Sequence, residues 1–400
     1  MSAATSTPLR TVRGLVTFSR GFRPFFFGAA LWTCLSMVAW ALMMSGHLIL
    51  PLAFDPVSWH AHEFLFGYLG AVIAGFLLTA VPNWTGRPPL VGWSLGALAL
   101  LWLIGRLIIA SPSGLASWQV AAIDLAFSLF LGLAIAREIF TSRNWRNVIV
   151  LAMLAVFIFA NALFHWEAAS GIYAAQGVGA RLGLATAIMM IAVIGGRIIP
   201  SFTRNWLQAR GDERLPTPPM QRFDKLSLVG LLAALSLWLL SPFGTVAAIA
   251  LACAGLLHAI RLSRWAGHRT LAEPLLSVLH LGYAFLPLGA VALAVSISMP
   301  SLLDMATAQH LWMTGAVGLM TLAVMTRATL GHTGQPLTAS RATLLLYGAL
   351  IVAVLARVAA GLWPDSSTWT LPLAALGWIG TFGGFAFVYG PLLLRRRPAG

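Results

Sequence analysis

Histidines are the side chains in this sequence best suited to metal chemistry. There are nine of them in a chain in which only 9% of residues are charged. Ionisable groups within apolar segments are costly to bury and tend to mark functional sites. His60, His62, His165 and His310 fall near corresponding ends of three apolar segments. Because imidazole is a ligand of copper, iron and zinc, their convergence would make a metal site. The alternative is that they are interfacial histidines beside an aromatic belt.

Two of these histidines lie two residues apart in the segment Trp59-His60-Ala61-His62-Glu63. On an α-helix, positions i and i+2 point about 200° apart, so both rings cannot face one ion. Either His60 lies in a non-helical stretch before the helix, or each histidine serves a different centre. Glu63 is suited to orient a ligand histidine by accepting its second N–H.

The other five histidines give a weaker signal. His258, His280 and His332 lie near the opposite ends of their segments and are candidates for a second site. For His258 a structural and a functional role are equally supported. His47 is interpreted as an interfacial residue and His268 as a solvated loop residue.

Three arginines, Arg106, Arg181 and Arg357, lie within or at the edge of apolar segments. A buried guanidinium needs an anion, and either haem propionates or nearby carboxylates would serve. The alternative is that these side chains extend to the lipid headgroups.

Twelve apolar segments must position these side chains, because each is long enough to cross about 30 Å of hydrocarbon. The sequence therefore predicts an all-α, polytopic integral membrane protein. The segments are 25–46, 60–82, 91–110, 118–138, 147–168, 179–200, 226–242, 245–262, 275–298, 307–329, 342–362 and 370–394.

The basic residues test that count. With a cytosolic N-terminus, all of the 25 lysines and arginines except Arg106, Arg181 and Arg357 fall toward the inner side. Positive charge favours the cytosolic side of a membrane protein. Twelve spans with both termini cytosolic are therefore expected. Residues 1–24 are interpreted as a basic cytosolic leader, 25–400 as a single membrane domain, and 201–225 as a cytosolic loop between two six-helix halves.

The composition excludes a soluble or disordered chain. Hydrophobic residues make up 59% of it and the mean hydropathy is +0.85, whereas a soluble domain carries about 25% charged residues. The formal charge of +14 would suggest nucleic acid in a soluble protein. Here the arginines occupy short gaps between apolar segments, so the expected partner is the lipid bilayer and not nucleic acid.

Several motifs of the chain resemble those of the NnrS family. They are Phe22-Arg23-Pro24-Phe25-Phe26, Trp59-His60-Ala61-His62-Glu63, Pro82-Asn83-Trp84-Thr85-Gly86-Arg87-Pro88, Gly195-Gly196-Arg197-Ile198-Ile199-Pro200, Leu279-His280-Leu281-Gly282-Tyr283 and Thr326-Arg327-Ala328-Thr329-Leu330-Gly331-His332-Thr333-Gly334. The resemblance covers nearly the whole chain, apart from 201–225 and the last two segments.

The resemblance implies a bacterial inner-membrane protein that contains haem b and copper and is linked to denitrification and nitric oxide defence. It implies His60, His62, His165 and His310 as metal ligands with Glu63 supporting one of them. His280 and His332, with Arg106, Arg181 and Arg357, are then assigned to haem.

The resulting hypothesis is a redox metalloprotein that binds or reduces nitric oxide near the outer face, with quinol or another electron donor. One rival is a transporter or metal- and haem-handling protein. Another is a non-catalytic haem sensor of nitric oxide. Polar groups of transporters usually lie near the bilayer midplane, which favours the first hypothesis because these histidines lie near span ends.

Overall fold

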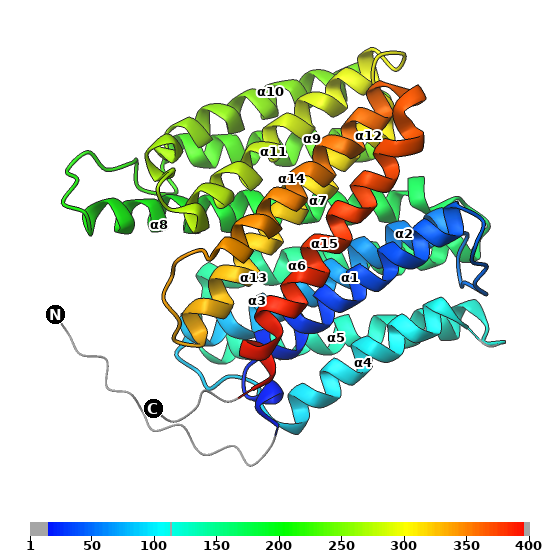
Figure 1. Ribbon diagram of the computed structural model, residues 1–400, viewed down its shortest axis with the longest axis horizontal. Helices are drawn as coiled ribbons and strands as arrows, with labels where there is room; N and C mark the ends of the chain where they lie inside the picture. Colours follow the sequence, from blue (N-terminus) through cyan, green and yellow to red (C-terminus); the bar gives the residue numbers. More distant parts are fainter. Residues whose placement is uncertain (1–14, 113, 396–400) are drawn as a thin grey trace.

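A computed structural model describes residues 15–112 and 114–395 as a bundle of long helices (Figure 1). Within these residues, twelve helices are long and apolar enough to cross a membrane. They begin and end within a few residues of most of the segments expected from the sequence, so the all-α, twelve-span prediction is confirmed. The proposed leader 1–24 falls largely on residues 1–14, which lie outside the described residues, and the first span begins at Phe22.

Nine of the spans are regular α-helices, and three contain a π-helical segment. The regular spans are α1 (Phe22–Met44), α4 (Trp93–Ala110), α5 (Ser117–Thr141), α6 (Val148–Ala169), α9 (Arg222–Leu240), α10 (Thr245–Ser263), α11 (Pro274–Ser298), α14 (Arg341–Leu362) and α15 (Ser367–Leu394). Span 2 consists of α2 (Pro56–His62), η2 (Glu63–Tyr68) and α3 (Leu69–Thr85). Span 6 consists of α7 (Val178–Met190), η5 (Ile191–Gly195) and α8 (Gly196–Gln208), and span 10 of α12 (Met305–His310), η7 (Leu311–Gly318) and α13 (Leu319–His332).

The first and last spans run side by side, as Figure 1 shows for α1 and α15. Nη1 of Arg23 donates hydrogen bonds to the carbonyl oxygens of Leu392 and Leu393 at 3.0 and 2.9 Å. The start of α1 and the end of α15 therefore lie at one end of the bundle, as an even number of spans requires. We call this the arginine-rich end, because Arg143 and Arg264 also follow helices that finish there.

Spans 2, 6 and 10 form the centre of the bundle. They contact one another and are, with α11, the most buried spans. All three π-helical segments lie in these central spans. A π-helical segment is rare and is often found at functional sites, because it rotates the side chains that follow it. The central spans are therefore where we examine the polar residues.

Candidate metal centre

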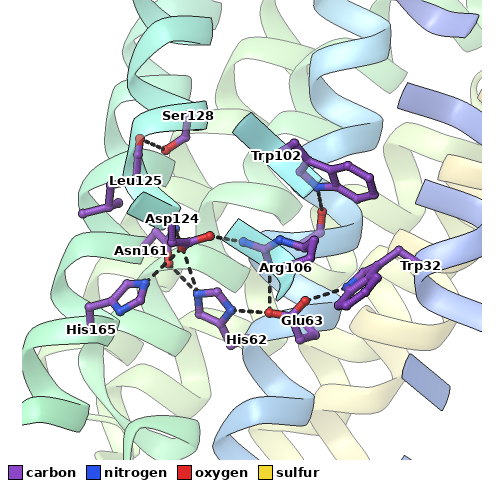
Figure 2. Close-up of polar contacts among 11 residues, drawn as sticks. Trp32, His62, Glu63, Trp102, Arg106, Asp124, Leu125, Ser128, Asn161 and His165 are labelled. Carbon is purple, nitrogen blue, oxygen red and sulfur yellow. Dashed lines mark hydrogen bonds and ion pairs between the residues drawn. The ribbon is translucent and has the colours of Figure 1, made fainter. Parts of the chain in front are cut away.

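Six buried polar residues meet toward the end of the bundle that lies opposite the arginine-rich end. We call this opposite end the arginine-poor end. We call the six residues the His62 cluster: His62 of α2, Glu63 of η2, Arg106 of α4, Asp124 of α5, and Asn161 and His165 of α6. Figure 2 shows their side chains pointing toward one another from these helices. Because Asn161 and His165 are four residues apart, they lie on the same face of α6.

The local sequence fixes the start of span 2. The Asp55 carboxylate accepts hydrogen bonds from the backbone N–H groups of Val57 and Ser58, and Pro56 occupies the first helical turn. This arrangement favours a helix start, because the carboxylate satisfies N–H groups that have no partner within the helix. Proline is tolerated in the first turn, since its missing N–H group would have no partner there. The cap sets the rotation of α2 and therefore the directions of His60 and His62.

Gly67 makes room for the ionic contacts of the cluster. A Cβ atom at this position would lie 2.5 Å from Nη1 of Arg106 and 2.8 Å from Oε2 of Glu63. Its carbonyl oxygen accepts a hydrogen bond from Nε1 of Trp102 at 3.0 Å. A larger residue at position 67 would therefore push Arg106 away from Glu63.

The hydrogen bonds of His62 require a cation at its Nε2 atom. Nδ1 of His62 lies 3.0 Å from Oε1 of Glu63, which can only accept. Nδ2 of Asn161 donates to Asp124 at 2.8 Å, so the amide oxygen of Asn161 faces Nε2 of His62 at 2.9 Å. Oδ2 of Asp124 lies 3.4 Å from the same nitrogen. Since every neighbour of Nε2 is an acceptor, the cluster is complete only with a proton or a metal ion there.

The same residues lie close enough together to share a metal ion. One ligand atom from each of His62, Asp124 and His165 lies within 4.8 Å of the others. Nε2 of His165 lies 3.0 Å from Oδ2 of Asp124. Two ligands that are each about 2.0–2.1 Å from one ion stand roughly 2.9–3.4 Å apart in octahedral or tetrahedral geometry. Two histidines and one carboxylate form a common metal-binding set with open positions.

Arg106 balances the two carboxylates. Nη1 of Arg106 donates to Oε1 of Glu63 at 2.7 Å, and Nη2 pairs with Asp124. Nε1 of Trp32 donates to the other oxygen of Glu63 at 2.5 Å. With neutral imidazoles the cluster carries a charge of about −1, which is unfavourable in a buried site and favours an added cation. Cu⁺ would bring this charge to about zero and Cu²⁺ to about +1, by the formal charges of these groups.

Aromatic rings pack around His62 and His165 in the cluster. The rings of Phe54, Phe66 and Phe164 lie 5.1 to 5.3 Å from the ring of His62, measured between centroids. The ring of Phe54 also lies 5.2 Å from that of His165. Electrostatic interactions inside this shell are screened less than they would be in water.

His60 points to a different group of residues, which we call the His60 group: His60, His310 and Arg357. The His60 ring stacks on Trp40, with ring centroids 4.5 Å apart. His310 and Arg357 interact electrostatically with it. Nδ1 of His310 lies 2.6 Å from the carbonyl oxygen of Ala306, so it donates there and leaves Nε2 free. Nδ1 of His60 is buried with no hydrogen-bond partner among the described residues.

The four histidines expected to converge therefore do not form one cluster. Convergence is confirmed for His62 and His165, while His60 and His310 belong to the second group. His60 and His62 both lie on helix α2 and point in different directions, so they do not face one site.

The residues assigned to haem are dispersed. Arg106 pairs with carboxylates, Nη1 of Arg181 donates to the carbonyl oxygen of Gln176 at 2.5 Å, and Arg357 donates to Thr307 at 3.3 Å. Nε2 of His280 lies 2.9 Å from the hydroxyl of Thr203 at the arginine-rich end. His332 is exposed and packs against Phe22. Among the described residues, no contact joins His332 to His280.

His258 belongs to a second buried network, the Tyr283 cluster: Asp224 of α9, His258 and Arg261 of α10, and Tyr283 of α11. Arg261 donates to Asp224 at 2.8 Å, to Tyr283 at 2.9 Å and to the carbonyl oxygen of Ala192 in η5 at 2.9 Å. The Tyr283 hydroxyl therefore donates to Nδ1 of His258 at 2.8 Å, and Nε2 of His258 donates to the Ser227 carbonyl at 3.0 Å. This network joins four spans, which favours a structural role for His258.

His47 and His268 are exposed, as interpreted from the sequence. Glu167, which also lies near the arginine-poor end, accepts hydrogen bonds from the backbone N–H groups of Val178 and Gly179 and caps α7. Its role is to hold a helix start.

Sequence reasoning missed Asp124 and Asn161 as members of the site. The available signal was a carboxylate within the apolar segment 118–138, since charged groups in spans tend to be functional. Asn161 lies in the middle of another span, one helical turn before His165.

The chain matches known proteins at the level of a family. A family model described as NnrS protein matches residues 16–397. No curated protein matches the chain.

Proposed function

The chain belongs to the NnrS family, and from this membership and the geometry of the His62 cluster we propose that it is a metal-dependent nitric oxide protein of the bacterial inner membrane. In this proposal His62, His165 and Asp124 hold copper. The observation that carries it is the buried grouping of ligand atoms from His62, Asp124 and His165, together with the acceptor atoms around Nε2 of His62, which a metal ion would satisfy as a proton does.

Each residue of the cluster has a role toward the metal. Glu63 accepts a hydrogen bond from the Nδ1–H group of His62, which leaves the Nε2 lone pair for the ion. Asn161 holds Asp124 in place, and Arg106 offsets the charge of the two carboxylates. Three protein ligands leave an open position where copper, when bound, would take a small ligand such as nitric oxide.

The residues assigned to haem do not form a haem-binding site. The apolar groove between spans 2, 6 and 10 has no histidine among its lining residues. We propose His60 and His310 as a second metal-binding pair. Nδ1 of His60 has no hydrogen-bond partner among the described residues, and the hydrogen bond of His310 uses its Nδ1 atom and leaves Nε2 for a metal. Reduction of nitric oxide would need an electron donor, for which a membrane quinol is proposed.

The test is the metal content and nitric oxide response of purified protein. Wild type should bind copper and change its electron paramagnetic resonance and absorption spectra when nitric oxide is added. His165→Gln should lose that copper, whereas the exposed control His47→Gln should keep it. Equal copper content in the three proteins would overturn the proposed centre. Turnover of nitric oxide with a reductant would then separate an enzyme from a sensor.

A further inference from the structure

A small pocket between spans 2, 4 and 5 extends to the His62 cluster. It lies between α3, α5 and α6 and has Asp124 and Asn161 at its polar end. The rest of its wall is almost entirely apolar and includes Phe66, Gly70, Ile73 and Phe157. Its free space holds about one molecule of water size.

Gly70 keeps this space open. The residue is buried in α3, yet a Cβ atom added to it would meet no heavy atom of the protein within 4 Å. Phe66 and Ile73 lie four residues before and three after it, so the three residues share one helical face. Protein interiors are close-packed, and a buried glycine that faces empty space is therefore an unusual feature.

The pocket adjoins a larger apolar groove at the centre of the bundle. Ile73 lines both spaces. The groove lies between spans 2, 6 and 10, and Thr321 is the one hydroxyl-bearing residue in its lining, with Phe76 and Ile194 among the others. Ile73 therefore lies at the boundary between the groove at the centre of the bundle and the pocket that is lined by the carboxylate of Asp124.

We propose that the Gly70 pocket binds a small uncharged diatomic gas and is the route by which it reaches the His62 cluster. This inference rests on the proposed function, because it assigns the substrate's path to that same site. An ion would have to lose its hydration along the apolar wall of this pocket, which is very costly. An uncharged gas that dissolves in hydrocarbon has no such cost, and the free space beside Gly70 admits only a very small molecule.

The first test measures nitric oxide association by stopped flow with the purified protein in lipid nanodiscs. Gly70→Val should slow association by about tenfold or more, and dissociation equally, because it closes a path without changing the ligands. Gly70→Ala should give a smaller effect in the same direction and serves if the valine variant does not fold. Gly348→Val is the matched control, since Gly348 is an exposed helical glycine of α14 that also has open space at its Cβ position. An unchanged association rate in Gly70→Val would overturn the proposal.

The second test needs neither metal nor activity. Crystals of the wild-type protein under krypton pressure should show krypton beside Gly70, and those of Gly70→Val should not. Absence of krypton from the wild-type pocket would overturn the proposal. If the wild type takes up krypton there but binds no nitric oxide, the pocket stands as a gas site and the function proposed for the His62 cluster fails.

Discussion

Replacing Glu63 with glutamine tests whether this residue orients a metal ligand, because its effect on metal affinity can be measured apart from its effect on the stability of the bundle. Glu63 accepts three hydrogen bonds, from His62, from Arg106 and from Trp32. Glutamine can keep the oxygen that faces His62 and Arg106, because both contact Oε1. Its amide group must then face Nε1 of Trp32, where a donor meets a donor.

The magnitudes follow from these contacts. An unsatisfied buried donor costs about 1–3 kcal/mol, so the metal-free Glu63→Gln variant should be less stable by that amount. A glutamine oxygen is also a weaker acceptor for the His62 N–H than a carboxylate. Loss of such a partner typically lowers metal affinity about 10–100-fold.

The assay is a copper titration against a competing chelator, together with denaturant unfolding of the metal-free protein. Glu167→Gln is the matched control, because Glu167 is an equally buried glutamate that caps α7 away from the cluster. It should lose stability and keep its copper affinity. Adding Trp32→Phe to Glu63→Gln should restore stability by removing the orphaned donor, without restoring affinity. If Glu63→Gln binds copper as tightly as Glu167→Gln does, Glu63 does not orient a metal ligand.

Three further predictions concern other parts of the molecule. His310→Gln should fold normally but bind less metal in total and lose protection against nitric oxide, because an amide is a poor ligand; unchanged metal content would leave His310 as an interfacial residue. Arg261→Met should destabilise the protein by about 3–5 kcal/mol in thermal or denaturant unfolding, since it leaves Asp224 buried and unpaired, while the copper content stays unchanged. Reporter fusions should place residues 205–225 and Arg395 in the cytosol and Asp304 on the other side; finding Arg395 and Asp304 on the same side would contradict the twelve-span topology.

The motif Gly195-Gly196-Arg197 shows how a sequence signal acquires its physical meaning from the fold. A Cβ atom at Gly196 would lie 2.6 Å from Cζ of Arg261. The glycine is therefore explained by the approach of Arg261 to η5, where it binds the carbonyl oxygen of Ala192. Nothing local in 195–197 indicates an arginine that lies more than sixty residues further along the chain.

The sequence alone determined the number of spans, because the thickness of hydrocarbon sets a minimum length for each apolar segment. It also predicted that His60 and His62 diverge if both are helical, since that follows from the helical repeat, and it identified Glu63 as a hydrogen-bond partner for a neighbouring histidine. These are local properties of one segment, and helix geometry carries them into the structure unchanged.

Only the tertiary structure decided which residues share a site. It brought His62 and His165 together, turned His60 away from them, added Asp124 and Asn161, and gave Arg106 two carboxylates as its anions. Such choices depend on how separate spans are rotated and packed against one another. A π-helical segment directly after His62 changes that rotation within one span. The other members of the cluster lie on three further helices, α4, α5 and α6, whose packing no single segment encodes.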